Sequence, residues 1–374
     1  MIKVLHVIPD LNYRGATKFV CLLATGLPQD RFRTAVATLG PGDPLTEPLR
    51  ALGFRVTTLD WRRAFDVRPF LRLRHLCDTF RPDVIHAWRL AGLRAVRFVV
   101  GRRVPILASS VFGSRGDSSL LSWLDRAFLR QADLIGISTP EEKEAAGRLG
   151  VCGQKLLCIP PAVSAACPFT AAHEDFCRSI GLPTEARFIA CVGPFESDKG
   201  HRDAIWAFDI LKFLYNNLHL ILVGSGSYGQ RLQEFARRIH WSKHVHFVGP
   251  QRDATPFLAQ AEFVWVPSRA RGGMHVALEA MAAGRPVLAA RIPDLAAVIE
   301  DGVTGFLVPP GDKVAMARQA RVLIDDSARA RQMGEAGRQR ALSRFAPANL
   351  VERLALAYDN LGAGGRARSH SAAV

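Results

Sequence analysis

The chain has 374 residues, of which 48% are hydrophobic and 22% are charged. This composition is typical of a folded globular protein and excludes a disordered one, and the length suits about two domains with separate cores. The formal net charge is +15, and residues 62–103 hold eleven arginines against three aspartates, with aromatic residues between them. Such a segment is typical of solvated helix faces or of a surface that contacts anionic lipid headgroups. We expect no nucleic-acid partner.

The amino terminus carries no basic and apolar leader, because Met1 is followed directly by the strand-like sequence IKVLHVI. No apolar run reaches the ~18 residues that would span a bilayer. The seven cysteines are scattered without a C-x-x-C pair, which favours reduced thiols over disulfides or a metal site. We therefore expect a cytoplasmic protein, either free or attached peripherally to the inner face of a membrane.

Short apolar runs alternate with helix-length segments along the chain, a pattern that predicts βαβ units and parallel sheets. In the first half, strands are predicted at residues 2–8, 33–39, 55–59, 84–87, 105–110, 134–137 and 155–159, with helices at 16–26, 67–80, 90–101 and 119–131. A second series has predicted strands at residues 188–192, 218–223, 245–249, 263–267 and 287–290, with helices at 203–214, 230–239, 255–260 and 276–283.

The two series predict an amino-terminal domain over residues 1–165 and a carboxy-terminal domain over residues 187–345. The segment 166–186 lacks clean periodicity and is predicted to be a linker. We expect a helix at 346–361 that packs back on the amino-terminal domain, and a disordered tail at 362–374. The predicted fold class is α/β, with two Rossmann-like domains that face a central cleft. Ligands bind at the carboxyl ends of the strands in such sheets.

The segment 268–312 carries the clearest ligand-binding pattern. A loop with Gly272 and Gly273 precedes an apolar helical stretch, which ends at residues 284–286. A loop that runs into a helix presents backbone N–H groups and the positive end of the helix dipole, which suits a phosphate. Glu279 lies about two turns into this helix, where its carboxylate can accept hydrogen bonds from a ribose.

Residues 224–229 form a literal G-x-G-x-x-G sequence between a predicted strand and a helix. Alone, this motif indicates a dinucleotide site. It lies in the second unit of the second series, however, and no acidic residue ends the next strand at the expected place. A NAD-dependent oxidoreductase is therefore a minor alternative.

Several stretches resemble retaining nucleotide-sugar glycosyltransferases of family 4 (glycosyl transferases group 1). They are HVIPDLNYRGATKFV, RPDVIHAWRLAGLRA, VGPFESDKGHRDAIWAF and the segment 268–312 with its EAMAAGRPVLA core. The resemblance covers the chain to about residue 361 and implies a GT-B fold. It implies transfer of a sugar from a UDP-, GDP- or ADP-sugar to a glycan or lipid-linked acceptor in polysaccharide biosynthesis. No metal or other cofactor is expected, and no D-x-D metal motif occurs.

The resemblance also implies roles for individual residues. The donor-side residues are Gly15 in a Gly-rich turn, Lys199 in a loop after a strand, and Arg271, Gly272, His275, Val276 and Glu279 around the next helix. On the acceptor side, His86 and Trp88 stand at the end of a strand. No catalytic residue is identified, because Val111 and Phe112 stand near the position where many members place a histidine.

Arg14, Ala162, Pro194 and Arg271 depart from the family pattern. Arg14 replaces one glycine of a pair, Pro194 stands where an arginine usually contacts the diphosphate, and Arg271 replaces the first of two glutamates. Arg271 admits three interpretations: it binds the diphosphate, it pairs with the carboxylate of an acidic sugar, or it marks a decayed site. The main functional alternative is therefore a catalytically impaired glycosyltransferase-like protein that acts as a binding module.

Overall fold

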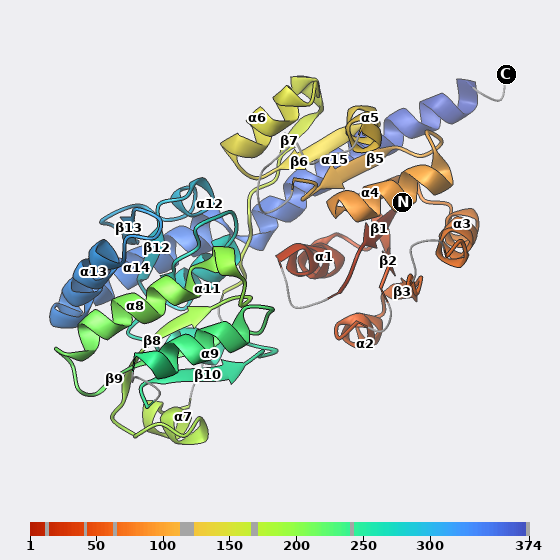
Figure 1. Cartoon of the computed structure of the whole chain (residues 1–374). Coiled ribbons are helices and arrows are strands. Elements are labelled where there is room, and N and C mark those ends of the chain that lie inside the picture. The colour runs from red at the N-terminus through yellow and green to blue at the C-terminus, as the bar shows by residue number, and fades with distance from the viewer. Residues whose placement is uncertain are drawn as a thin grey trace. The chain divides into compact units, whose positions relative to one another are not determined.

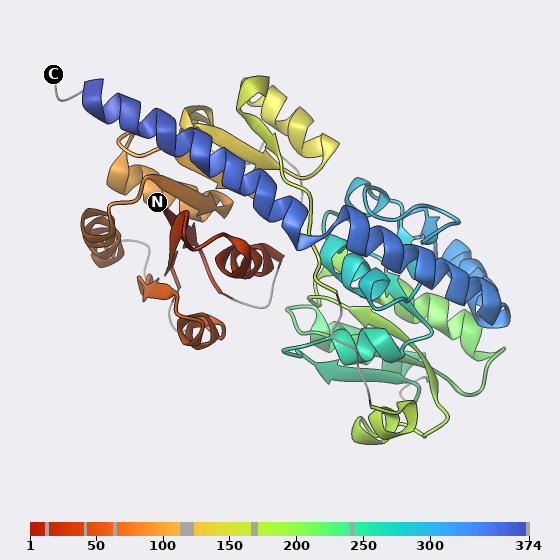
Figure 2. The same cartoon turned by 180° about the vertical axis from the view of Figure 1, so that it is seen from behind.

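The structure, a computed structural model, describes residues 1–11, 15–40, 43–62, 66–112, 123–165, 171–239 and 243–371. The chain divides into two compact units. The first comprises Met1–Pro160 and Pro347–Val374, and the second comprises Pro161–Ala346. Each unit is an α/β structure built on one parallel sheet with helices on its faces (Figures 1 and 2).

The sheet of the first unit has seven strands in the order β3-β2-β1-β4-β5-β6-β7. These strands are β1 (Ile2–Ile8), β2 (Phe32–Thr38), β3 (Arg55–Thr58), β4 (Val84–Trp88), β5 (Ile106–Ser109), β6 (Leu134–Ile137) and β7 (Leu156–Cys158). All neighbouring pairs are parallel. Because both faces of such a sheet are covered, β4 is buried along its whole length rather than at every second residue.

The carboxy-terminal segment completes the first unit. The helices of this unit are α1 (Gly15–Gly26), α2 (Thr46–Ala51), α3 (Arg68–Phe80), α4 (Arg89–Val100), α5 (Trp123–Gln131), α6 (Pro140–Arg148) and α15 (Pro347–Ser371), with the 3-10 turn η2 (Gly153–Lys155). Helix α15 contacts α1, β1 and β4, and it buries Leu350, Leu354 and Tyr358 (Figure 2).

Helix α15 continues beyond residue 361, where the sequence predicts a disordered tail, and runs to Ser371. Gly362 lies against β1 at this point, since a Cβ built on it would be 3.3 Å from Ile2 Cδ1. This contact gives the glycine-bearing part of the helix a packing partner that sequence composition does not reveal.

The sheet of the second unit has six strands in the order β10-β9-β8-β11-β12-β13, all parallel. They are β8 (Arg187–Val192), β9 (Leu218–Val223), β10 (Val245–Gly249), β11 (Phe263–Val266), β12 (Val287–Ala290) and β13 (Gly305–Val308). The strand residues alternate between two hydrophobic clusters. One contains Phe188 and Leu278, and the other contains Phe208 and Trp265.

Part of the predicted linker belongs to the second unit. The helices of this unit are α7 (His173–Ser179), α8 (His201–Lys212), α9 (Gly229–Arg238), α10 (Thr255–Gln260), α11 (Met274–Ala282), α12 (Pro293–Ala296), α13 (Lys313–Asp325) and α14 (Ser327–Arg344), with the 3-10 turn η3 (Ser197–Lys199). Helix α7 buries Phe176 and Cys177 in the core, and the Phe176 ring lies 5.9 Å from Phe188. A helix this short shows no clear periodicity in the sequence.

Three general features concern the part of the chain that the structure describes. None of its helices combines the length and the apolar character needed to cross a membrane. No group of three His, Cys, Asp or Glu residues is placed to hold a metal ion. The six cysteines in this part of the chain are free.

Candidate functional site

The loops after β8, β9 and β11 meet at the carboxyl edge of the second unit's sheet. The Phe195 N–H donates to the Ser225 oxygen at 3.0 Å, and the Tyr228 N–H donates to the Phe195 oxygen at 2.8 Å. These bonds join the first two loops. The Arg269 N–H donates to the Asp198 oxygen at 2.8 Å, which joins the third loop to the first. In open parallel sheets, ligands bind at this edge.

Lys199 and Gly272, both predicted from the sequence as donor-side residues, are neighbours at this edge. The Lys199 Nζ donates to the main-chain oxygen of Arg271 at 2.8 Å and lies 3.0 Å from the Asp198 carboxylate. A Cβ built on Gly272 would lie 3.4 Å from the same Nζ. Glycine at position 272 therefore keeps the space beside the ammonium group open.

Helix α11 begins after two glycines with left-handed backbones, Gly272 (φ 108°) and Gly273 (φ 90°). A Cβ on Gly273 would approach Val266 Cγ1 to 2.6 Å, so both conformation and space require glycine there. His275 and Val276 lie in the first turn of α11, where backbone N–H groups point toward the amino-terminal end of the helix. Glu279 follows, half-buried, on the same helix. The predicted donor-side residues of this segment thus form one loop–helix unit.

A buried carboxylate that sequence reasoning missed organises the loop. Asp294, in the first turn of α12, accepts the Gly272 N–H at 2.6 Å, and its Oδ1 lies 3.5 Å from Arg271 Nε. The side chains of Arg271 and Asp294 are 19% and 5% exposed. Arg271 is therefore held as one member of a largely buried ion pair. The position of Asp294 just after β12 is the sequence signal that could have identified it.

A second missed pair fixes the loop after β11 to α8. The guanidinium of Arg269 binds Asp203 through two N···O contacts of 2.6 Å, and the Asp203 side chain is 3% exposed. This bidentate pair raises the pKa of Arg269. Lys313 Nζ lies 3.9 Å from the same carboxylate. The pair positions the loop that carries Arg271.

Pro194, which stands where the family usually has an arginine, is held by a buried histidine. The His201 Nε2 donates to the Pro194 oxygen at 3.1 Å, and its Nδ1 lies 3.2 Å from Cys191 Sγ. Burial lowers the pKa of His201 to about 4, so the ring is neutral near pH 7. The neutral tautomer with a proton on Nε2 fits both contacts, and it fixes the loop between β8 and α8.

The first two glycines of the G-x-G-x-x-G sequence, Gly224 and Gly226, are required by packing between two loops. A Cβ on Gly224 would lie 1.9 Å from the Gly193 oxygen, and a Cβ on Gly226 would lie 2.4 Å from the Phe195 oxygen. Backbone therefore approaches backbone too closely for any side chain. This packing accounts for the motif without a bound dinucleotide.

The predicted acceptor-side residues of the first unit are buried, whereas the predicted donor-side residues of the second unit lie at a sheet edge. His86 and Trp88 are buried, with 0% and 1% exposure. The His86 ring nitrogens contact Tyr358 OH at 2.6 Å and Ser109 Oγ at 2.8 Å, and Trp88 Nε1 donates to His6 Nδ1 at 3.2 Å. Burial and the neighbouring His6 lower the pKa of His86.

These contacts correct the acceptor-side assignment. The side chains of His86 and Trp88 point into a polar cluster that links the sheet to α15. Neither reaches a surface where a ligand could contact it. The prediction failed because the position of a residue at a strand end does not determine which way its side chain points. Gly15 is the first residue of α1, and Arg14 lies outside the described residues.

Comparisons with known proteins agree with this two-unit architecture. Residues 173–340 match the family described as Glycosyl transferases group 1, and residues 13–166 match Glycosyltransferase Family 4. The glycogen synthase of Mycobacterium tuberculosis is 30% identical, over 75% of this chain and 69% of that protein. The lipopolysaccharide core biosynthesis glycosyltransferase LpsE of Rhizobium meliloti is 25% identical, over 74% of this chain and 75% of LpsE.

A solved structure shares the whole fold. HepE of Anabaena, determined in complex with UDP-glucose, has a TM-score of 0.84 at 18% sequence identity, and the match covers 96% of this chain and 100% of HepE. The two Rossmann-like units are therefore those of the GT-B fold. The sequence matches cover both units in chain order. The chain belongs to the family 4, group 1 glycosyltransferases.

Proposed function

We propose that the protein transfers a sugar from a nucleotide-sugar to a glycan or lipid-linked acceptor, with retention of anomeric configuration and without a metal ion. The observation that carries this proposal is the meeting of Lys199 with Gly272 and the start of α11 at one sheet edge. HepE is described in complex with UDP-glucose, which supports a nucleotide-sugar as the donor here.

The donor diphosphate needs positive charge and N–H donors, and this edge supplies both. Lys199 contributes an ammonium group, and the first turn of α11 contributes backbone N–H groups at His275 and Val276 together with the helix dipole. Pro194 provides no second cation. The guanidinium of Arg271, 19% exposed, is therefore our candidate for a second contact, either to the diphosphate or to the carboxylate of an acidic sugar.

The rest of the donor is assigned from the same helix. Glu279 would accept hydrogen bonds from the ribose hydroxyls, because it lies on α11 beyond the phosphate-binding turn. Lys199 and the dipole of α11 would stabilise the charge that develops on the leaving diphosphate. The family resemblance implies that this diphosphate accepts the proton of the acceptor hydroxyl on the same face of the sugar, which gives retention.

The acceptor is argued from the surface of the first unit. A ladder of rings runs from Trp61 through Phe70 and Phe98 to Phe128, with successive centroid distances of 5.0, 6.1 and 5.5 Å. Phe98 is 64% exposed. We call these four residues the aromatic ladder. The other three rings are partly buried, so the ladder presents one exposed ring on an aromatic base, which suits an interfacial membrane contact.

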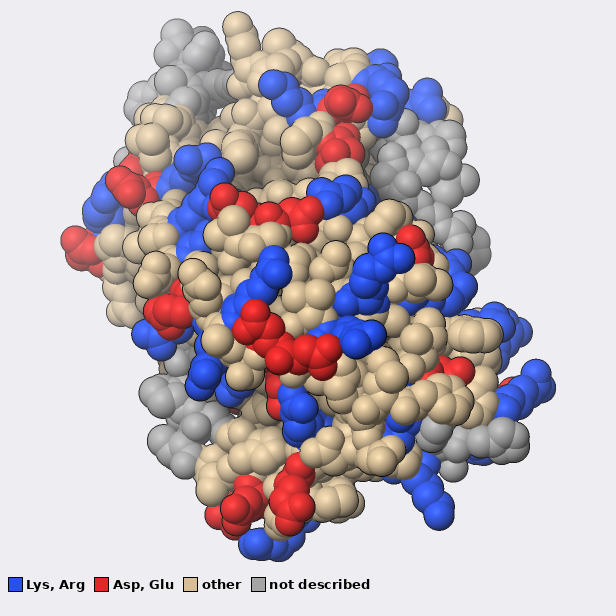
Figure 3. Space-filling view, turned by 90° about the vertical axis from the view of Figure 1, so that its left-hand side faces the viewer, with Lys and Arg blue, Asp and Glu red and all other residues tan. Residues whose placement is uncertain are grey.

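The charge around the aromatic ladder fits an anionic membrane. Six exposed arginines lie on the elements that carry the ladder or beside them: Arg68, Arg72, Arg74, Arg102, Arg103 and Arg126. On the face of the second unit shown in Figure 3, basic and acidic side chains are interspersed instead. We therefore propose peripheral attachment through the first unit, which would bring the protein to a lipid-linked acceptor.

A thermal-shift screen tests the donor assignment. UDP-, GDP- and ADP-sugars are compared with NAD(H) on the full chain and on Glu279→Ala, with Glu335→Ala on the exposed side of α14 as the matched control. We expect one nucleotide-sugar to stabilise the protein and the Glu335→Ala control. The shift should be lost in Glu279→Ala.

The other outcomes separate the alternatives. Stabilisation without sugar transfer to any acceptor would indicate a binding module. A response to NAD(H) alone would contradict the assignment of the donor. Arg271→Glu should weaken the use of a uronic-acid donor more than that of a neutral-sugar donor, and unchanged turnover with both donors would remove Arg271 from the mechanism.

A further inference from the structure

A cavity of about 420 Å³ lies at the amino-terminal edge of the second unit's sheet, opposite the donor loops. It is bounded by residues at the beginnings of β8, β11 and β12 and by the first turn of α14. Its charged lining residues are Arg187, Arg285, Arg331, Glu185 and Glu262. Its volume lies within the range of small-molecule sites, about 300–1,000 Å³.

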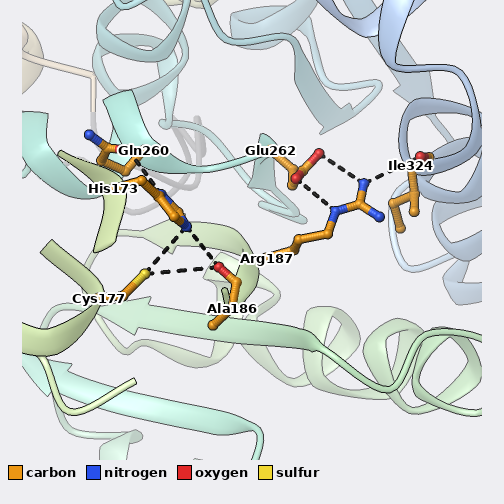
Figure 4. A network of polar contacts seen from close by, with 7 residues as sticks. All are labelled: His173, Cys177, Ala186, Arg187, Gln260, Glu262 and Ile324. Atoms are coloured by element: carbon orange, nitrogen blue, oxygen red, sulfur yellow. Dashed lines mark hydrogen bonds and ion pairs between the residues drawn. The ribbon is translucent and has the colours of Figure 1, made fainter. Parts of the chain in front are cut away.

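One wall of the cavity is a fixed polar network (Figure 4). Arg187 and Glu262 form a bidentate ion pair with N···O distances of 2.8 and 3.1 Å, and Arg187 also donates to the Ile324 oxygen at 3.3 Å. His173 donates from Nε2 to the Ala186 oxygen at 2.9 Å. These groups already have partners, so the wall is formed before any ligand arrives.

Arg285 differs from the other charged groups of this wall. It follows α11 and is half-buried, yet its guanidinium makes no hydrogen bond or ion pair within the part of the chain that the structure describes. Burial lowers the pKa of Arg285, and the charge of the neighbouring Glu262 offsets this effect in part. Glu262 is paired with Arg187. Because Arg285 lines the cavity and its guanidinium has no partner among the described residues, its N–H donors are available to a ligand there.

We propose that this cavity binds a small phosphomonoester, such as a sugar phosphate, through Arg285 and Arg331. Arg331 is exposed on α14, one turn after Ser327, which begins the helix and also lines the cavity. Guanidinium groups match the oxygens of a phosphate, and the first turn of the 18-residue α14 adds the positive end of its dipole.

The balance of charge in the lining favours an anion. The Arg187–Glu262 pair is neutral, which leaves Arg285 and Arg331 against the exposed Glu185. Asp326 caps α14 by accepting the Arg329 N–H at 2.9 Å, so its carboxylate uses one first-turn amide and offsets part of the helix dipole. The two arginines therefore supply most of the attraction for an anion. The volume exceeds what a bare phosphate fills, and Glu185 can accept hydrogen bonds from sugar hydroxyls.

Calorimetric titration of the full chain with ribose 5-phosphate, ribose and inorganic phosphate tests this site. We expect ribose 5-phosphate to bind at one site and more tightly than either fragment, also in the presence of saturating UDP. Arg285→Gln should weaken this binding about tenfold to a hundredfold, because hydrogen bonds to a charged group are lost. Arg318→Gln, which changes an exposed arginine on α13, is the matched control.

A second readout separates a binding role from a structural one. Without ligand, Arg285→Gln should melt no lower than the wild type, because the change removes a partly buried cation without a partner. Absence of binding, equal binding by wild type and Arg285→Gln, or displacement by UDP would each overturn the proposal. Inorganic phosphate binding as tightly as ribose 5-phosphate would overturn the sugar part of it. None of these readouts requires sugar transfer, so the result is independent of the proposed function.

Discussion

The ammonium nitrogen of Lys199 lies 2.8 Å from the main-chain oxygen of Arg271, which locks the loop after β8 to the loop that precedes α11. The first loop follows Val192 and the second follows Val266, at the ends of two neighbouring strands. A single lysine thus joins the two loops and, in the proposed donor site, would also supply the positive charge that meets the diphosphate.

Replacing Lys199 should therefore abolish most of the activity. We expect Lys199→Met to lower kcat for sugar transfer about 10²- to 10³-fold, on the scale of a lost oxyanion-hole donor, because charge on the leaving diphosphate is no longer stabilised. Steady-state kinetics with the preferred donor measures this loss. Lys143→Met, on the exposed surface of α6, should leave kcat unchanged. Equal kcat in the two variants would contradict the assignment of Lys199 to the leaving diphosphate.

The Arg271–Asp294 pair should be energetically coupled. Asp294→Ala leaves a largely buried guanidinium and the Gly272 N–H without their common partner, which should cost about 3 kcal/mol of unfolding free energy. The double variant Arg271→Met, Asp294→Ala should cost less than the sum of the single variants. Urea unfolding of the four proteins measures the coupling.

The exposed pair of Asp175 and Arg178 provides the comparison for this cycle. Both side chains are about two-thirds exposed, at 65% and 66%. Asp175→Ala should therefore cost less than about 1 kcal/mol. A coupling energy near zero for Arg271 and Asp294 would show that the buried pair does not organise the loop.

The G-x-G-x-x-G sequence at residues 224–229 allows a test of the room that the structure leaves for a Cβ atom. Gly226→Ala should destabilise the protein and weaken donor binding, because its Cβ would lie 2.4 Å from the Phe195 backbone oxygen. Gly229→Ala is the matched control, because its Cβ would meet Phe195 Cδ2 at 3.4 Å. Melting temperatures and donor titrations distinguish the two. Equal changes of melting temperature and donor affinity in the two variants would contradict the explanation by packing.

The fold class and most elements could be predicted from the sequence, because both sheets are parallel and buried. Their strands are therefore continuous or nearly continuous apolar runs that end in turn residues, as at residues 188–192 and 218–223, the second interrupted only by His219. Helix α7 escaped prediction because seven residues are too few to show a period. The extension of α15 escaped it because its support, the contact of Gly362 with Ile2, is distant in sequence.

The candidate site could be predicted only where residue type and local spacing decide the chemistry. Gly272, Gly273 and Glu279 share one loop and helix, so their proximity follows from local structure. Asp294 reaches Gly272 across the ends of two strands, which no local pattern shows. His86 lies at the predicted strand end, but burial depends on the packing of Tyr358 from the other end of the chain.

Acid should weaken the second unit through His201. Burial lowers the pKa of its ring to about 4, against 6.5 in the unfolded chain. Between pH 6.5 and 4 the unfolded chain binds a proton that the folded protein does not, so stability falls as the pH is lowered through this window. The loss is steepest near the middle of this window, at roughly 1.2 kcal/mol per pH unit, and it levels off near pH 4, where the folded ring also binds a proton.

Substitution at His201 tests this linkage. Urea unfolding of the wild type should give a lower free energy of unfolding at pH 5 than at pH 7, and the buried His6 and His219 should act in the same direction. His201→Gln should reduce the difference between the two pH values. His75→Gln, on the exposed side of α3, should not. An unchanged difference in His201→Gln would exclude this histidine as a source of acid sensitivity.

Membrane attachment should depend on apolar side chains of the first unit. Phe98 and Leu71 are 64% and 62% exposed beside the arginines of α3 and the aromatic ladder. The double variant Phe98→Ser, Leu71→Ser should lower partitioning to phosphatidylglycerol–phosphatidylcholine vesicles at least about tenfold. Burying one large apolar side chain already contributes about 1.5–3 kcal/mol. Vesicle sedimentation measures the bound fraction.

Phe213 provides the matched control, because it is 76% exposed but belongs to the second unit. If the first unit makes the contact, Phe213→Ser should partition like the wild type, and pure phosphatidylcholine vesicles should bind all three proteins weakly. The dependence on anionic lipid follows from the arginines, whose attraction to the surface falls as salt is added. Equal binding of the double variant and the wild type would place the membrane contact elsewhere, and equal binding to neutral vesicles would show that the arginines do not contribute.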